Sequence, residues 1–367
     1  MANNFLNQLE ALPLNSRVCL FGAGDGGENF KRILERERSD VKLISFLDDF
    51  KSGERDGLKI VQLNDLGSLS GKFDLILITS AFWKEMQKRL VKLKIRNFRI
   101  VNPFLFYEYL IFSEEEWKEY SPQLRKAQAL LKYAEDRSLY GYLAEIRRIN
   151  LKETEHLYEY FRNRQLDRSR QYLEFINKKK IHTIIEGGVF DGSNTVEFIK
   201  FLPSDGFIYG FDPLYPSLEN ENKNFLNKFS NVRIYPEALW SRRETLNFCE
   251  NKDNKEGSKI VDSPETQTDF KHIPAVSIDE FVSEERIDKI DFIKLDVEGA
   301  ELDILKGAEN TLKTSRPQLA ISIYHQKEDL FGIPLYLDKV LEGYCYRIQH
   351  YSSTFWDTVW YALPNEE

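Results

Sequence analysis

Residues 184–192 read IIEGGVFDG, a short apolar run that leads directly into a glycine-rich turn. The next segment, NTVEFIKFL, has helical spacing, so the turn is expected to join a strand to a helix. Glycines in such a turn let a ligand lie against backbone N–H groups. Glu186 stands at the strand end, where a carboxylate would repel a phosphate and suits a positively charged ligand. The turn therefore predicts a ligand site for a cationic molecule.

A second acidic residue follows the next expected strand. Asp212 ends the segment FIYGFD, 26 residues after Glu186. An acid at this position can accept hydrogen bonds from both hydroxyls of a ribose. The two acids would then bracket one nucleoside-like ligand at the carboxyl edge of a parallel sheet.

The segment KLDVEG at 294–299 adds a third polar cluster to the same edge. Lys294 and Asp296 alternate with apolar residues in an otherwise buried strand, which favours a functional role. Glu298 and Glu301 fall in the first turn of the helix that follows, where acids stabilise the helix dipole. We assign Glu301 that structural role alone, and Glu298 a mixed one.

His325 ends the strand QLAISIYH and faces the same predicted edge. This position favours a catalytic role over a structural one. The remaining histidines lack such support and are expected to be structural: His156, His182, His272 and His350.

With these segments in view, residues 181–363 resemble the FkbM-type methyltransferases. The resemblance rests on IIEGGVFDGSNTVEF, FIYGFDPLYPS, the EALW turn at 237–240, DFIKLDVEGAELDILKGAENTL and ISIYHQKEDLFGIPLYL, in the order and at the spacing of the family. It implies the seven-stranded class I methyltransferase sheet. It also implies transfer of a methyl group from S-adenosylmethionine, usually to a hydroxyl.

The resemblance also implies roles for individual residues. The methionine part of the donor would be surrounded by Glu186, Gly187, Gly188, Asp191 and Asn194. Asp212 would bind the ribose, Ala238 and Leu239 would lie near the adenine, and Asp296 and Glu298 would sit close to the methyl group. Two positions depart from the family pattern. Glu186 stands where an aspartate is common, and Ser322 stands where many relatives carry an acid, so acidic support for His325 must come from elsewhere.

The expected chemistry follows from charge. A sulfonium donor is already activated, so the protein must align the reactants and handle the proton of the acceptor hydroxyl. We predict His325 as the general base, with Asp296 and Lys294 orienting the acceptor or the base. A metal-assisted variant that uses Asp296 and Glu298 lacks a second ligand cluster, so no metal is predicted.

A second glycine turn, GAGDGG at 22–27, follows the apolar run VCLF. Gly22, Gly24 and Gly27 fit the G-x-G-x-x-G pattern, and Asp48 lies 21 residues beyond the last glycine. This part resembles the small Rossmann-like domains that precede sugar-modifying enzymes in bacterial surface-glycan pathways. It is expected either to bind a nucleotide or nucleotide-sugar or to serve as a scaffold.

Two further functions stay open beside methyl transfer. The first is an NAD(P)-dependent nucleotide-sugar oxidoreductase or epimerase that uses the N-terminal turn. The chain has no Tyr-x-x-x-Lys dyad, the usual base of such enzymes. The second is a non-catalytic nucleotide-binding scaffold.

The expected architecture is α/β with two Rossmann-like domains, at 1–106 and 177–367, joined by a helical connector at 107–176. In the second domain we expect NVRIYPEAL to be one strand, TLNFC and AVSIDEF to be shorter strands, and AELDILKGAENTLK to be one helix. The closing runs CYRIQHY and TVWYALP have no room for a helix between them, so they are expected to pair antiparallel.

Composition limits the possible partners and the cellular location of the protein. A net charge of −8 disfavours a nucleic-acid partner, and no apolar run approaches the roughly 20 residues of a membrane span. The N-terminus shows no secretory signal, and Cys19, Cys249 and Cys345 are widely spaced, so a cytoplasmic location is expected. The expected acceptor is a small molecule or glycan, with a sugar hydroxyl of a surface glycan or its precursor favoured. The sequence leaves the oligomeric state open.

Overall fold

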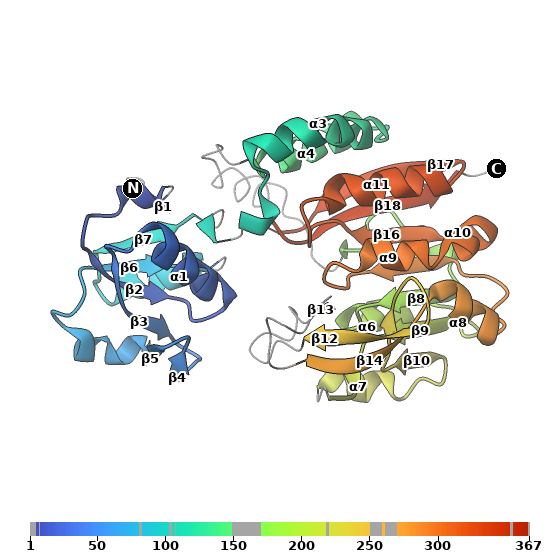
Figure 1. The fold of residues 1–367 in the computed structure, drawn as a ribbon. Helices are drawn as coiled ribbons and strands as arrows, with labels where there is room; N and C mark the ends of the chain where they lie inside the picture. The colour runs from blue at the N-terminus through green and yellow to red at the C-terminus, as the bar shows by residue number, and fades with distance from the viewer. Residues whose placement is uncertain are drawn as a thin grey trace. The chain divides into compact units, whose positions relative to one another are not determined.

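The structure is a computed structural model that describes residues 5–6, 8–80, 83–102, 105–106, 108–148, 170–217, 220–249, 259–260, 270–352 and 355–365. The described residues fall into two compact units (Figure 1). The first extends to Ile111. The second comprises Phe112–Arg148 and the residues described from 170 onward.

The first unit is built on a seven-stranded sheet with the order β1-β7-β6-β2-β3-β5-β4. Its strands are β1 (Phe5–Leu6), β2 (Arg17–Phe21), β3 (Lys42–Asp48), β4 (Gly53–Arg55), β5 (Leu58–Gln62), β6 (Leu75–Ile78) and β7 (Phe98–Val101). All neighbours pair parallel except β4 and β5. The α-helices are α1 (Asp25–Glu37) and α2 (Trp83–Lys92), and short 3-10 turns cover Leu9–Ala11, Leu63–Leu69 and Glu108–Leu110. The predicted Rossmann-like fold of this part is confirmed.

The second unit contains a seven-stranded sheet with the order β10-β9-β8-β15-β16-β18-β17. Its strands are β8 (Thr183–Gly187), β9 (Phe207–Phe211), β10 (Val232–Tyr235), β15 (Phe292–Leu295), β16 (Gln318–Ser322), β17 (Tyr344–His350) and β18 (Thr358–Pro364). Only β18 runs antiparallel to its neighbours, β16 and β17. This arrangement confirms the predicted class I methyltransferase sheet and its antiparallel closing pair.

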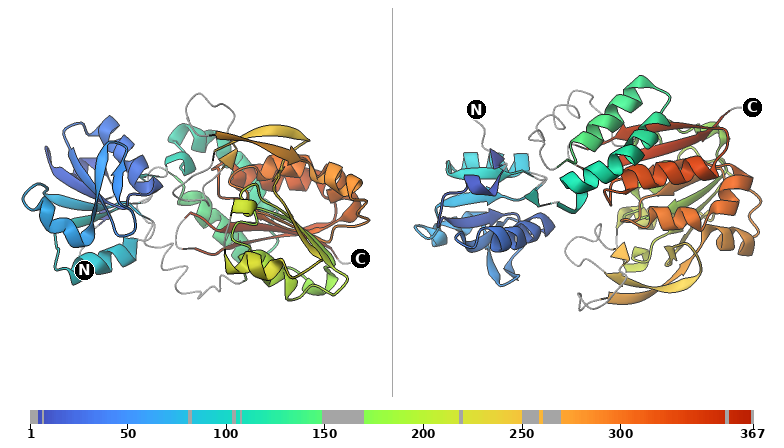
Figure 2. Two further views of the ribbon diagram at one scale, coloured as in Figure 1. Left: turned by 90° about the horizontal axis from the view of Figure 1, so that it is seen from below. Right: turned by 45° about the horizontal axis from the view of Figure 1, so that its top comes forward.

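Helices cover this sheet, as the two views of Figure 2 show. They are α3 (Glu114–Ala129), α4 (Ala134–Glu145), α6 (Ser193–Ile199), α7 (Glu221–Leu226), α8 (Ile278–Glu284), α9 (Glu301–Lys306), α10 (Glu309–Ser315) and α11 (Asp329–Val340), with 3-10 turns at Lys178–Lys180 and Tyr215–Ser217. The expected connector includes α3 and α4. Both belong to the second unit, where α3 contacts α11 and α4 contacts β17.

A small third sheet differs from expectation. It has the order β11-β14-β12-β13 and consists of β11 (Ala238–Leu239), β12 (Glu244–Cys249), β13 (Lys259–Ile260) and β14 (Phe270–Val276). NVRIYPEAL is therefore not one strand, because β10 and β11 belong to different sheets.

One strand assignment and one helix assignment are also corrected. The segment SIDEF is a helix, α8, because Ser277 and Glu280 form a capping box in which each side chain bonds the other residue's backbone N–H. AELDILKGAENTLK forms two helices that part at Gly307. A Cβ there would lie 2.4 Å from the carbonyl oxygen of Trp240, so the chain passes another backbone too closely for any other residue.

Among the described residues, no helix combines the length and the apolar character needed to cross a membrane.

Candidate active site

The predicted glycine turn joins β8 to α6. Gly188 has a φ of +75°, and a Cβ on it would lie 1.8 Å from the carbonyl oxygen of Asp296. Only glycine fits this position, which lets the ends of β8 and β15 touch. The turn and the KLDVEG segment are thereby brought to one edge of the sheet, as predicted from the sequence.

Glu186 and Lys294 form a buried pair beneath this turn. They face each other across β8 and β15, and Lys294 Nζ lies 3.9 Å from Glu186 Oε1. Lys294 also donates to the carbonyl oxygens of Gly187 and Gly188, while Thr195 donates to Glu186 Oε2 at 2.6 Å. Burial raises the pKa of Glu186 to about 7, although Lys294 and Thr195 oppose the shift. Lys294 therefore supports the turn, whereas the sequence suggested contact with the acceptor or the base.

Asp212 lies just past β9, beside the same turn. Its carboxylate accepts hydrogen bonds from the backbone N–H groups of Phe190 (2.7 Å) and Leu214 (2.8 Å). Asp191 accepts from the backbone of Ser193 at the start of α6. Asn194 is half-buried on the first turn of that helix. The expected adenine neighbours, Ala238 and Leu239, form β11 and are buried.

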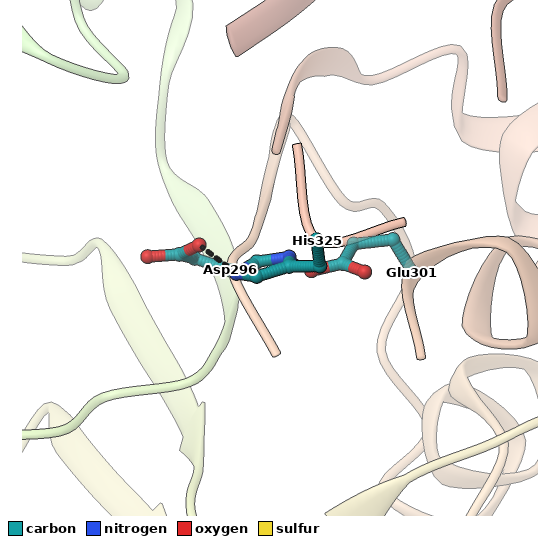
Figure 3. Close-up of side chains that lie close together, drawn as sticks. All are labelled: Asp296, Glu301 and His325. Atoms are coloured by element: carbon teal, nitrogen blue, oxygen red, sulfur yellow. Dashed lines mark ion pairs between the residues drawn. The ribbon is translucent and has the colours of Figure 1, made fainter. Parts of the chain in front are cut away.

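His325 lies among carboxylates (Figure 3). Its Nδ1 is 2.8 Å from Glu301 Oε1, and its Nε2 is 3.5 Å from Asp296 Oδ1 and 3.6 Å from Glu298 Oε1. Only 4% of the His325 side chain is exposed, against 25% for Asp296 and 34% for Glu298. The structure thus brings together three residues that the sequence singled out.

Two tyrosines fix Asp296. Tyr172 donates to its Oδ2 at 2.7 Å and Tyr324 donates to its Oδ1 at 2.8 Å. Burial alone would raise the pKa of Asp296, but the charges of Lys294 and His325 outweigh that effect and hold the pKa below its usual value. Asp296 is therefore a fixed carboxylate at neutral pH.

Charge also sets the protonation of His325. Burial alone would lower its pKa, yet the carboxylates of Glu301 and Glu298 hold the pKa well above its usual value. Burial is also the main reason why the pKa of Glu298 is raised. With only protein groups present, His325 is an imidazolium at neutral pH, so it needs a cationic neighbour before it can accept a proton.

Glu301 is the residue that the sequence analysis underestimated. Its carboxylate accepts from the backbone of Val297 (2.9 Å) and Gly299 (3.1 Å), which fixes it against His325. This is the acidic support that Ser322 does not supply. Glu301 is the first residue of α9, and acids are common there because they stabilise the helix dipole. Its position in the sequence therefore did not indicate a role in the site. Tyr172 and Tyr324 likewise stand in segments that read as apolar packing.

The glycine turn of the first unit, at 22–27, has surroundings that differ from those of the turn between β8 and α6. Asp48 accepts from the backbone of Ala23, Phe50 and Lys51, so its carboxylate holds the loops on either side of the strand end. Arg55 reaches the turn from β4 and pairs with Asp25 and Glu28. Gly22, Gly24 and Gly27 form the turn itself, between β2 and α1. Acids at this helix start disfavour a phosphate ligand.

Comparison with known families matches each unit separately. Residues 187–348 match the family described as Methyltransferase FkbM domain. Residues 14–101 match the family described as C2185-like, N-terminal. No curated protein matches the chain.

Among solved structures, the chain is similar to methyltransferase FkbM from Methylobacillus flagellatus KT, with a TM-score of 0.65 and 17% identity over 95% of this chain and 90% of that one. A methyltransferase from Geobacter sulfurreducens aligns over 62% of this chain and 96% of its own, at 12% identity and a TM-score of 0.33. C. glutamicum DAP dehydrogenase aligns over 22% of this chain and 25% of its own, at 14% identity and a TM-score of 0.19. The last two scores are too low to bear on fold or function.

The first similarity shows a shared fold, and the family match lies on the unit that carries Asp296 and His325. The family match supports methyl transfer as the class of reaction of this unit.

Proposed function

We propose that this protein transfers a methyl group from S-adenosylmethionine to a hydroxyl, in a sugar of a surface glycan or its precursor. The observation that carries the proposal is the glycine turn that lies between the carboxylates of Glu186 and Asp212 in the unit that matches the FkbM family. The sugar acceptor rests on the sequence resemblance alone.

The chain's own groups suit a cationic donor. Glu186 is buried at the turn, and Asp296 is ionised at the neighbouring strand end. In this proposal Gly187, Gly188, Asp191 and Asn194 surround the methionine part, Asp212 faces the ribose, and Ala238 with Leu239 borders the adenine. A bound sulfonium donor supplies an activated methyl group.

The acceptor side is assigned to His325. As the acceptor oxygen bonds to the methyl carbon, the carbon–sulfur bond breaks and its electron pair stays on sulfur. The hydroxyl proton must leave, and Nε2 of His325 is the base proposed from the sequence. Positive charge entering the site lowers the pKa of His325 and so permits this role. Glu301 orients the ring and Tyr172 with Tyr324 orients Asp296.

Isothermal calorimetry on the full chain tests donor binding. We expect S-adenosylmethionine and S-adenosylhomocysteine to bind, and Asp212→Asn to weaken both by about tenfold or more, the scale of losing a charged hydrogen-bond partner. Asp205→Asn, an exposed acid before β9, is the matched control and should bind normally.

Other outcomes would contradict the proposal. Binding of NADH without S-adenosylmethionine would favour the oxidoreductase alternative, and silence from all ligands would favour a scaffold. Labelled methyl transfer to a panel of nucleotide-sugars and glycans then tests the acceptor class.

A further inference from the structure

The two nitrogens of His325 have different surroundings. Nδ1 faces Glu301, whose carboxylate is held in place by two backbone N–H groups. A carboxylate at 2.8 Å favours hydrogen on Nδ1. Once Nε2 has lost its proton, its lone pair points toward the other side of the site.

On that other side Nε2 faces two more acceptors. The carboxylate oxygens of Asp296 and Glu298 lie 3.5 and 3.6 Å away, and among the described residues neither ring nitrogen has a partner with regular hydrogen-bond geometry. Figure 3 shows Asp296 and Glu301 on either side of the ring. Two carboxylates that face a buried ring nitrogen need positive charge between them. With protein groups alone the proton on Nε2 supplies this charge, and a divalent cation that displaces the proton can supply it instead.

The two separations measured from Nε2 suit a metal ion. Two ligand atoms about 2.1 Å from one ion at a tetrahedral angle lie about 3.4 Å apart. The separations of 3.5 and 3.6 Å from Nε2 match that value. Hydrogen-bonded pairs would be shorter, at about 2.7–3.2 Å.

The outer partners of the three groups agree with this reading. Metal-bound histidines commonly give their other ring N–H to a carboxylate, and metal-bound carboxylates are themselves hydrogen-bonded. Glu301 fills the first role, and Tyr172 and Tyr324 fill the second for Asp296. Glu298 is held in the left-handed region, with a φ of +59°, a conformation that costs energy and is concentrated at functional sites.

We propose that His325 Nε2, Asp296 and Glu298 bind a divalent cation of the first transition series. One imidazole with two carboxylates suits Mn²⁺ or Zn²⁺ better than Ca²⁺, which takes oxygen ligands alone. The sequence predicts no metal, because it shows no further ligand beside Asp296 and Glu298. The fold supplies that ligand, His325, from the loop that follows β16.

The catalytic meaning of the site rests on the proposed function, whereas cation binding does not. A cation there would bind the acceptor hydroxyl and make it more acidic. His325 would then serve as a ligand, and the role of proton acceptor would pass from it to another group or to water.

Cation binding is tested on the full chain with two probes, Mn²⁺ by loss of its free EPR signal and Zn²⁺ by calorimetry. We expect one site per chain for at least one of them, weakened at least about tenfold by Glu298→Gln and by His325→Ala. Glu309→Gln, which changes an exposed carboxylate on α10, should leave binding unchanged. Glu298 is partly exposed, so its variant is the milder one, and a thermal melt checks its folding.

Two results would overturn the inference in different ways. If neither cation shows a site that weakens in both variants, the metal site is wrong. If transfer survives complete metal removal but is lost in His325→Ala, the catalytic role is wrong and His325 is the proton acceptor. Binding of S-adenosylmethionine is measured on the same samples, so failure of the donor proposal is scored separately.

Discussion

At the scale of single residues, the buried Glu186 of the proposed donor site makes the free energy of unfolding depend on pH. Burial raises its pKa to about 7, whereas the unfolded chain releases this proton near pH 4.5. Between these values the folded protein binds a proton that the unfolded chain does not. The free energy of unfolding therefore falls as the pH rises through this window, by about 1.4 kcal/mol for each unit.

Glu186→Gln removes this dependence and keeps an acceptor for Thr195. Without donor, we expect the variant to gain stability relative to the natural protein between pH 5 and pH 8. Urea unfolding followed by tryptophan fluorescence measures this, because four of the five tryptophans lie in the second unit. An equal difference at both pH values would show that Glu186 is ionised throughout.

The sequence predicted the placement of a residue where its side chain stands at a strand end. Asp296, Glu298 and His325 meet because parallel strands end at one edge, a rule that needs only strand order. Glu301 and Tyr172 were missed for another reason. Each reaches the site through its exact place in a loop or helix turn, which periodicity does not encode. The sequence singled out Lys294, but the direction of its side chain is set by hydrogen bonds to the backbone of the glycine turn, which the sequence does not show.

At the scale of elements, α8 shows what a cap contributes. Ser277 is buried and its hydroxyl accepts from the backbone of Glu280. We expect Ser277→Ala to lower the free energy of unfolding by about 1 kcal/mol, the usual cost of losing an N-cap. Ser283→Ala, an exposed change in the same helix, is the control and should be nearly neutral. Equal effects of the two changes would mean that the capping box is not formed.

The two wrong element assignments depend on features that the apolar pattern of the segment does not show. AVSIDEF reads as apolar alternation, yet its second half obeys the capping box, a signal carried by only two residues. AELDILKGAENTLK has a continuous helical pattern, yet the helix is interrupted at Gly307, where the backbone of Trp240 passes close by. Strands of the main sheets were predicted well because their apolar runs are long and bounded by glycine, proline or charge.

At the scale of the whole molecule, two α/β folds in one chain were predictable from alternating strand and helix patterns. Their limits were not. The helices α3 and α4 read as a connector because their segment is poor in glycine and proline, but they pack on α11 and β17 and so belong to the second unit. Packing partners of an amphipathic helix are set by tertiary contacts, which its own sequence does not name.

Separate cores lead to a prediction about unfolding. The core clusters of the first unit draw on residues between Phe5 and Phe106, and those of the second on residues between Tyr172 and Leu363. We expect scanning calorimetry to resolve two transitions. S-adenosylmethionine at a hundred times its dissociation constant should stabilise the second unit by about 2.7 kcal/mol, which raises that transition by several degrees.

The transition of the first unit is the internal control, because the groups assigned to the donor all lie in the second unit. It should stay in place with S-adenosylmethionine and also with NADH, since Asp25 and Glu28 at the start of α1 leave a net negative charge beside the glycine turn even after pairing with Arg55. A shift of this transition alone with NADH would restore a nucleotide site to the first unit. A single transition that moves as a whole would show that the two cores unfold together.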